Sequence, residues 1–111
     1  IKYALENGAD YILVLNNDVT IDPNLISQLI KALDGNSKYA IASPKIFFAK
    51  GFEFHKDKYK EEDKGRVFWY AGGIMDWANV IARHRGVDEV DKGQYQKIED
   101  IYLLIKLLIS S

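Results

Sequence analysis

The sequence contains no cysteine and only two histidines and two prolines among its 111 residues. Without cysteine the chain cannot form disulfides, a thiolate nucleophile or a cysteine–zinc site. The two histidines, His55 and His84, are too few for a histidine-rich metal site. Carboxylates are therefore the residues left for metal chemistry, and carboxylates favour hard ions such as Mg²⁺ or Mn²⁺.

An excess of charge is also missing, because the formal net charge is -1. A nucleic-acid-binding surface needs an excess of positive charge, and this balance does not indicate one. The longest apolar run, residues 101–109, is interrupted by Lys106 and is too short to span a bilayer. No pattern of a secretory signal is visible, so we expect a cytoplasmic protein. The content of 48% hydrophobic and 28% charged residues predicts a single packed domain over residues 1–111.

The order of local patterns predicts an α/β fold. Residues 1–8 are typical of the last turns of a helix closed by Gly8. Residues 11–15 form a continuous apolar run of β-forming residues, which is typical of a strand buried on both faces of a parallel sheet. Asp22 and Pro23 predict a helix start, followed by apolar residues at helical spacing up to Gly35. We therefore expect a mostly parallel sheet with flanking helices.

Further elements follow along the chain. Strands are predicted at residues 39–42, 46–48 and 67–71, and a strand or hairpin arm at residues 74–82. Residues 50–65 are charged and aperiodic, which predicts a surface loop, and residues 84–93 form a second polar loop. Apolar residues in the tail, residues 98–109, recur at helical spacing, and a strand is the alternative.

Three polar residues, Asn16, Asn17 and Asp18, follow the predicted strand at residues 11–15. In open α/β sheets, ligands bind outside the carboxyl ends of the strands. A carboxylate placed there could hold a divalent cation that neutralises a diphosphate leaving group. Alternatively, the three residues only form a turn before the next helix. Their spacing alone leaves both interpretations open.

The segment from Asp10 to Val19, followed by Ile21-Asp22-Pro23, resembles the metal-binding segment of family 2 nucleotide-sugar glycosyltransferases with the GT-A fold. Three later segments look like the next strand and the middle region of rhamnosyltransferase-like members of that family. These segments are Ala42-Ser43-Pro44-Lys45-Ile46, Tyr70-Ala71-Gly72-Gly73, and His84-Arg85-Gly86 with Asp91-Lys92-Gly93-Gln94 after it. The resemblance covers residues 1–97 in the family's order, so it implies a partial GT-A fold.

The resemblance also implies roles for individual residues. Asp18 would coordinate the Mg²⁺ or Mn²⁺ that bridges the diphosphate of a nucleotide-sugar donor, with Asn16 and Asn17 near the ribose or the phosphates. Gly72 and Gly73 would let the backbone approach the sugar or the acceptor closely, although a plain bulge or turn is the alternative.

The loop residues His84 and Arg85 could contact phosphate or acceptor, and a surface loop without such a contact is the alternative.

Two parts of the family's pattern have no counterpart in the sequence. The first strand–loop–helix unit, which grips the base and ribose, would precede residue 1. The Thr-Gly pair and the Glu-Asp pair that supplies the catalytic base are also missing, and Glu99-Asp100 comes too early in the order to replace them. We therefore name no catalytic residue, and we expect the isolated chain to be inactive.

In full-length form, the implied enzyme would transfer a sugar to a hydroxyl of a glycan or lipid-linked acceptor, and it could associate peripherally with a membrane. A second hypothesis is a truncated, inactive remnant that self-associates, for example as a homodimer, because missing elements expose a sheet edge and an apolar face. A nucleotidyltransferase is a third hypothesis, but the Gly-rich pyrophosphate loop that would support it is not present near residue 1.

Overall fold

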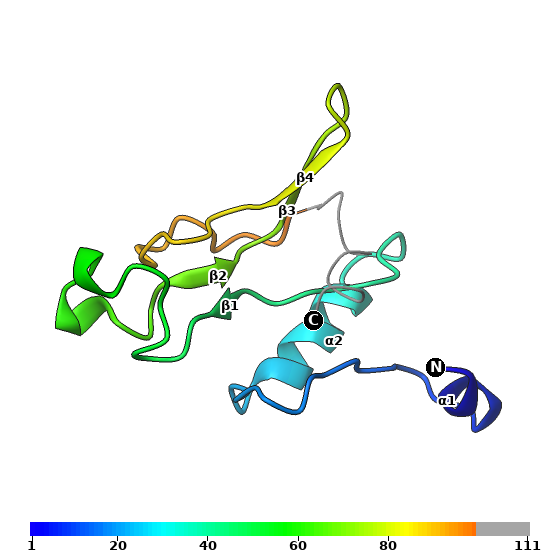
Figure 1. Ribbon diagram of the computed structural model, residues 1–111. Coiled ribbons are helices and arrows are strands. Elements are labelled where there is room, and N and C mark those ends of the chain that lie inside the picture. The colour runs from blue at the N-terminus through cyan, green and yellow to red at the C-terminus, as the bar shows by residue number, and fades with distance from the viewer. Residues whose placement is uncertain (100–111) are drawn as a thin grey trace.

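The computed structural model describes residues 1–99 (Figure 1). Most of the tail for which a helix or a strand is predicted, residues 98–109, lies outside these residues. The elements are, in chain order, α1 (Lys2–Glu6), α2 (Leu25–Asp34), β1 (Ile46–Phe47), the 3-10 turns η1 (Lys56–Lys58) and η2 (Glu61–Asp63), β2 (Phe68–Tyr70), β3 (Gly73–Asp76) and β4 (Ile81–His84). Strand β1 pairs antiparallel with β2, and β3 pairs antiparallel with β4.

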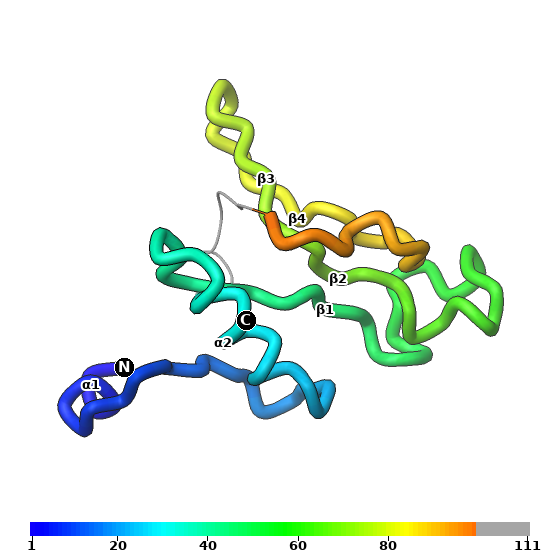
Figure 2. Tube along the Cα trace, turned by 180° about the vertical axis from the view of Figure 1, so that it is seen from behind, coloured from blue at the N-terminus to red at the C-terminus, as the bar shows by residue number. Residues whose placement is uncertain are grey.

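The predicted fold class, a mostly parallel sheet with flanking helices as in a partial GT-A fold, is wrong. Within residues 1–99 both sheets have two strands, and both pairs are antiparallel. Antiparallel strands can pair through a short local connection, whereas parallel strands need a long crossover. The hairpin of β3 and β4 is such a local pair and projects from the rest of the molecule (Figures 1 and 2).

The predicted central strand at residues 11–15 is not a strand in the structure. These five residues lie outside regular secondary structure, and their exposed fractions run from 39% at Ile12 to 53% at Val14. None of the described residues forms a hydrogen bond to their backbone. The segment has the composition of a buried strand, but residues 1–99 provide no neighbouring strand, and a strand needs that neighbour. Residues 39–42, also predicted as a strand, have no regular structure either.

Both predicted N-terminal helices are confirmed, although they do not enter the core. Helix α2 begins at Leu25. Just before it, the backbone N–H of Asn24 donates to Asp22 Oδ1 at 2.7 Å. Pro23 therefore precedes the helix and does not occupy its first position. Neither α1 nor α2 contains a buried residue. The apolar face of α2 remains half-buried, with Ile26 exposed.

The core is centred on β2, which confirms the strand predicted at residues 67–71. Val67, Phe68, Tyr70 and Ala71 are buried, and Phe47 stacks on Phe68 with 4.8 Å between ring centroids. Both sides of this strand are hydrogen-bonded. On one side Val67 O accepts the Phe48 N–H at 2.9 Å, and on the other Phe68 N–H donates to the carbonyl of residue 89 at 2.9 Å.

The loop at residues 50–65, predicted correctly as a loop, is closed at its base by Glu53. The Glu53 side chain is buried and accepts the backbone N–H groups of Gly51 at 2.8 Å and Gly65 at 2.6 Å. Burial by itself raises the pKa of this carboxyl, but the backbone N–H groups and the Lys64 ammonium outweigh burial. The net pKa of Glu53 is therefore lowered, and the charged form holds the loop closed.

The Glu53→Gln variant should unfold at a lower temperature than the wild type at pH 7. The pKa of Glu53 is lower in the folded chain than its unfolded value of about 4.3. Its stabilising contribution is therefore present above that pH and is lost as the pH falls through the folded pKa. Thermal unfolding followed by circular dichroism should show a difference at pH 7 that shrinks toward pH 3. Glu62→Gln, at an exposed position of the same loop, is the matched control, and equal melting of all three proteins at pH 7 would contradict this role.

Gly86 is the position where the core tolerates no side chain. Its φ is +74°, and an added Cβ would lie 2.7 Å from Tyr95 Cε2 and 3.1 Å from the Ala71 Cβ. The Tyr95 ring also contacts Phe68 edge-on, with 5.5 Å between centroids. A larger residue at position 86 would therefore displace the ring that covers β2.

We predict that Gly86→Ala lowers the free energy of unfolding by about 2 kcal/mol or more, because left-handed strain and displacement of Tyr95 add together. The control is Gly93→Ala, since φ is +83° there but the nearest atom would be 3.8 Å away. That variant should lose about 1 kcal/mol from strain alone. Urea denaturation measures both losses, and equal losses would show that Tyr95 does not pack on Gly86 in solution.

Candidate functional site

The residues predicted to bind a metal and phosphates, Asn16, Asn17 and Asp18, lie in an exposed turn before α2. Within residues 1–99 no hydrogen bond reaches the Asp18 carboxylate, and it is Asp22 that accepts the backbone N–H next to the helix start. Asp18 therefore does not cap its own loop among these residues. Its oxygens stay available to an external ligand.

The predicted glycine pair forms the bend between the two sheets. Gly72 has a φ of +120°, a conformation that favours glycine, and its carbonyl accepts the Arg85 N–H at 2.7 Å. Gly73 begins β3 and pairs with His84. Both glycines are buried. The bend turns the chain from β2 into the hairpin, and Gly72 also reaches the wall of a cleft.

This cleft, of about 610 Å³, lies between α2, the chain before β1, the end of β2 and the segment at residues 95–99. Of the residues assigned a role from the sequence, Gly72 and Arg85 line it. Asn16, Asn17, Asp18 and Gly73 are not among its lining residues. The structure therefore brings together two of the predicted positions and leaves the predicted metal residue outside.

The cleft carries an excess of positive charge. Four cationic side chains line it, against the single carboxylate of Glu99. The four are Lys38, Lys45, Arg85 and Lys97. Leucines of α2, Leu25 and Leu29, add an apolar wall. A ligand that combines a negative charge with an apolar part matches this lining.

Arg85 is held in place by three contacts. Its Nε donates to the Ala71 carbonyl at 2.8 Å, its guanidinium lies 4.7 Å from the Tyr95 ring centroid, and its Nη1 pairs with Glu99. The neighbouring His84 instead packs edge-on against Trp69, with 4.7 Å between ring centroids, and does not line the cleft. Of this predicted pair, only Arg85 is placed to meet a ligand in the cleft.

The Tyr70 hydroxyl is a further polar group of this region that the sequence did not single out. It is buried and has no hydrogen-bond partner among the described residues. Burial raises the pKa of the Tyr70 phenol, and the nearby Ser43 hydroxyl and Arg85 guanidinium oppose the rise.

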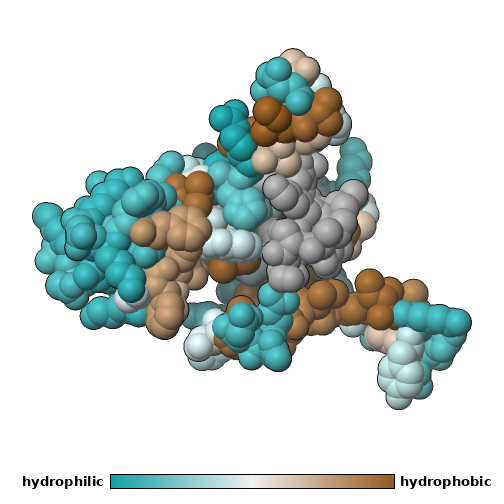
Figure 3. Space-filling view, viewed as in Figure 1, coloured by the Kyte–Doolittle hydropathy of each residue, from teal (hydrophilic) through white to brown (hydrophobic). Residues whose placement is uncertain are grey.

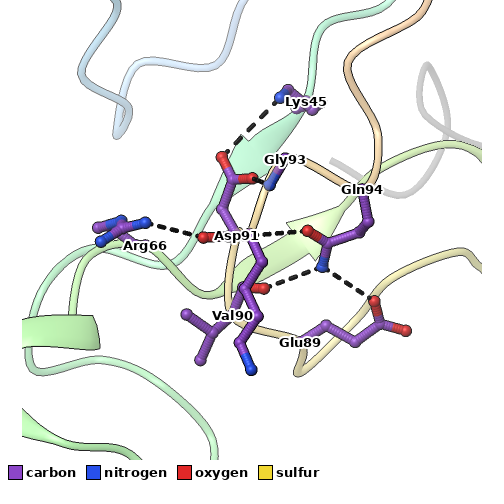
Figure 4. Close-up of polar contacts among 8 residues, drawn as sticks. Lys45, Arg66, Glu89, Val90, Asp91, Gly93 and Gln94 are labelled. Atoms are coloured by element: carbon purple, nitrogen blue, oxygen red, sulfur yellow. Dashed lines mark hydrogen bonds and ion pairs between the residues drawn. The ribbon is translucent and has the colours of Figure 1, made fainter.

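The turn at residues 89–94 fixes the chain that leads into Tyr95 (Figure 4). Asp91 Oδ1 accepts the Gly93 N–H at 2.9 Å, and Arg66 donates to the Asp91 carbonyl at 2.8 Å. Lys45 of the cleft pairs with Asp91 Oδ2 at 3.9 Å. The last segment of the resemblance is therefore a compact turn that supports the cleft wall.

A second polar cluster surrounds Asp88, beside a hollow of about 340 Å³. Asp88 has a φ of +71°, and its Oδ2 accepts a hydrogen bond from Lys58 Nζ at 3.0 Å and lies 2.8 Å from His55 Nδ1. Burial raises the pKa of Asp88, but Lys58 and His55 outweigh it and leave the pKa lowered. The cluster ties the loop at residues 50–65 to the core. No local sequence pattern predicts this cluster, because His55 and Lys58 lie about thirty residues before Asp88.

No group of three or more histidine, aspartate or glutamate side chains within residues 1–99 could hold a metal ion. Asp18, with the Asn16 and Asn17 amides, offers hard oxygen ligands that fit Mg²⁺ or Mn²⁺ only if ligand phosphates complete the set. In the same part of the chain no helix is long and apolar enough to cross a membrane.

A scan of the sequence against protein-family models found no match, and searches of curated proteins and of solved structures found none either.

Proposed function

We propose that this chain is part of a glycosyltransferase that uses nucleotide-diphosphate sugars, and that the basic cleft takes the donor's diphosphate. One observation supports the proposal above the others. Three segments that carry the resemblance, residues 42–46, 70–73 and 84–86, are separate in sequence, yet residues of all three line the same cleft. In full-length form the enzyme would transfer the sugar to an acceptor hydroxyl of a glycan or lipid-linked molecule.

The charge and chemistry of the cleft support a phosphorylated ligand. A diphosphate is a compact, multiply charged anion, and the Arg85 guanidinium, whose Nε and Nη1 are engaged by the Ala71 carbonyl and Glu99, keeps Nη2 to donate to a phosphate oxygen. Lys38 and Lys97, which form no ion pair within residues 1–99, would add point charges. The nucleoside or the sugar would meet the leucines of α2.

Asp18 lies outside the cleft lining, so a divalent cation held by Asp18 would meet a donor phosphate that extends beyond the cleft, and it would neutralise charge there. Asp18 supplies one carboxylate, so its affinity for the ion alone is low. The isolated chain is expected to transfer no sugar, since no residue in it matches the family's catalytic base. Binding is therefore the property to measure.

We predict that the full chain binds inorganic pyrophosphate and uridine diphosphate in calorimetry, and that Mn²⁺ tightens the binding about tenfold, or roughly 1.4 kcal/mol. Asp18→Asn should lose the Mn²⁺-dependent gain and keep the binding seen without metal. Arg85→Lys should weaken binding in both conditions, because a lysine cannot bond the Ala71 carbonyl and Glu99 and still present a fixed donor to the phosphate.

Asp10→Asn is the matched control, since Asp10 is an exposed carboxylate of the same segment outside the motif. It should behave as wild type with and without Mn²⁺. Equal Mn²⁺ dependence in wild type and Asp18→Asn would reject Asp18 as a metal ligand. Unchanged pyrophosphate binding in Arg85→Lys would reject the cleft as the diphosphate site.

A further inference from the structure

The exposed apolar segment at residues 11–15, here called the edge segment, covers none of the protein's core. Its five side chains are Tyr11, Ile12, Leu13, Val14 and Leu15, all exposed to a similar degree. Figure 3 shows hydrophobic surface along this part of the chain, between α2 and α1. Contiguous apolar surface of this kind marks an interaction site in soluble proteins.

The backbone of the edge segment limits what can cover it. Within residues 1–99 its N–H and C=O groups form no backbone hydrogen bonds. Aromatic and β-branched residues favour pairing as a strand, and an added strand satisfies the backbone while it covers alternate side chains. The partner that fits this segment is therefore another extended, apolar strand.

We propose that the edge segment pairs with the same segment of a second copy of this chain, antiparallel and centred on Leu13. The flanking charges favour this arrangement. Around Leu13, Asp10 of one copy lies opposite Asn16 of the other, so no two carboxylates are directly opposite each other. A parallel, in-register pair would instead place Asp10 against Asp10, and like charges directly opposite each other are destabilising.

The size of the contact sets the expected strength. Five residues that are about half exposed present on the order of 450 Å² per chain, so a pair buries at most roughly 900 Å², below the 1,200–2,000 Å² of a stable interface. The neighbouring exposed residues Val19, Ile21 and Ile26 can extend the contact. A dissociation constant of about 1–100 µM is therefore expected.

The hairpin of β3 and β4 provides a matched control surface. Its apolar residues include Trp77 and Ile81, and Ile81 is 52% exposed, close to the 53% of Val14. The hairpin strands are already paired with each other, so their backbone does not require a partner in the same way. A lysine at position 81 adds the same charge as a lysine at position 14 without touching the edge segment.

Sedimentation velocity of the full chain between about 1 and 200 µM tests the association, in the range expected from the contact area. The wild type and Ile81→Lys should shift from monomer to dimer across this range, whereas Val14→Lys should stay monomeric. A monomer at every wild-type concentration overturns the proposal and leaves the edge segment to a different partner. Dimerisation of Val14→Lys equal to wild type overturns it as well, because the contact then lies elsewhere.

Single cysteines test the register, since the sequence has none of its own. In the proposed pair the two Leu13 Cα atoms lie about 4.5–5.5 Å apart, within reach of a disulfide. The two Tyr11 positions are four residues apart along the pair, or about 14 Å. Leu13→Cys should therefore form a disulfide-linked dimer on oxidation, and Tyr11→Cys should not. Equal cross-linking of both variants indicates a parallel pair and overturns the antiparallel register, as does cross-linking of neither.

Discussion

Backbone hydrogen bonds along both edges of β2 hold the structure together. Phe48 bonds to one side of this strand, and residues 85–89 bond to the other. The core side chains, Phe68 and Tyr70 among them, belong to the same strand, and Tyr95 closes over it by packing on Gly86. Strand β1 forms one two-stranded pair with β2, and β3 and β4 form another. A two-stranded pair is only marginally stable by itself. Each persists because it continues from β2 or pairs with it.

Local patterns in the sequence predicted local structure well and long-range pairing poorly. The spacing of Leu25, Leu29 and Leu33 identified α2, and the aromatic run at residues 67–71 identified the core strand. The apolar run at residues 11–15 has the same local character, yet it lies exposed. Strand composition reports that a segment can pair, but the presence of a partner depends on distant residues. The parallel sheet inferred from that run was wrong for this reason.

Local motifs likewise predicted only part of the candidate site. Gly72 and Arg85, found through short motifs, do line one cleft, while Asp18 lies outside it. Glu53 and the Asp88 cluster were missed because Gly65, which closes the loop on Glu53, is 12 residues away in sequence and His55 is 33 residues from Asp88. The left-handed backbone of Asp88 has no signature in a single sequence either. Such groups become visible only when the chain is folded.

Hydrogen exchange of the backbone amides tests the central claim that the core is built on β2. Mass spectrometry follows the exchange on about 0.1 µM protein, so that any pairing at the expected affinity is largely dissociated. The amides of Phe48, Phe68 and Ala71, which are hydrogen-bonded in the core, should exchange slowly. The amides of residues 11–15 should exchange at nearly the rate of an unstructured peptide. Protection of residues 11–15 equal to that of β2 in the monomer would contradict the account, because it would place them inside a sheet.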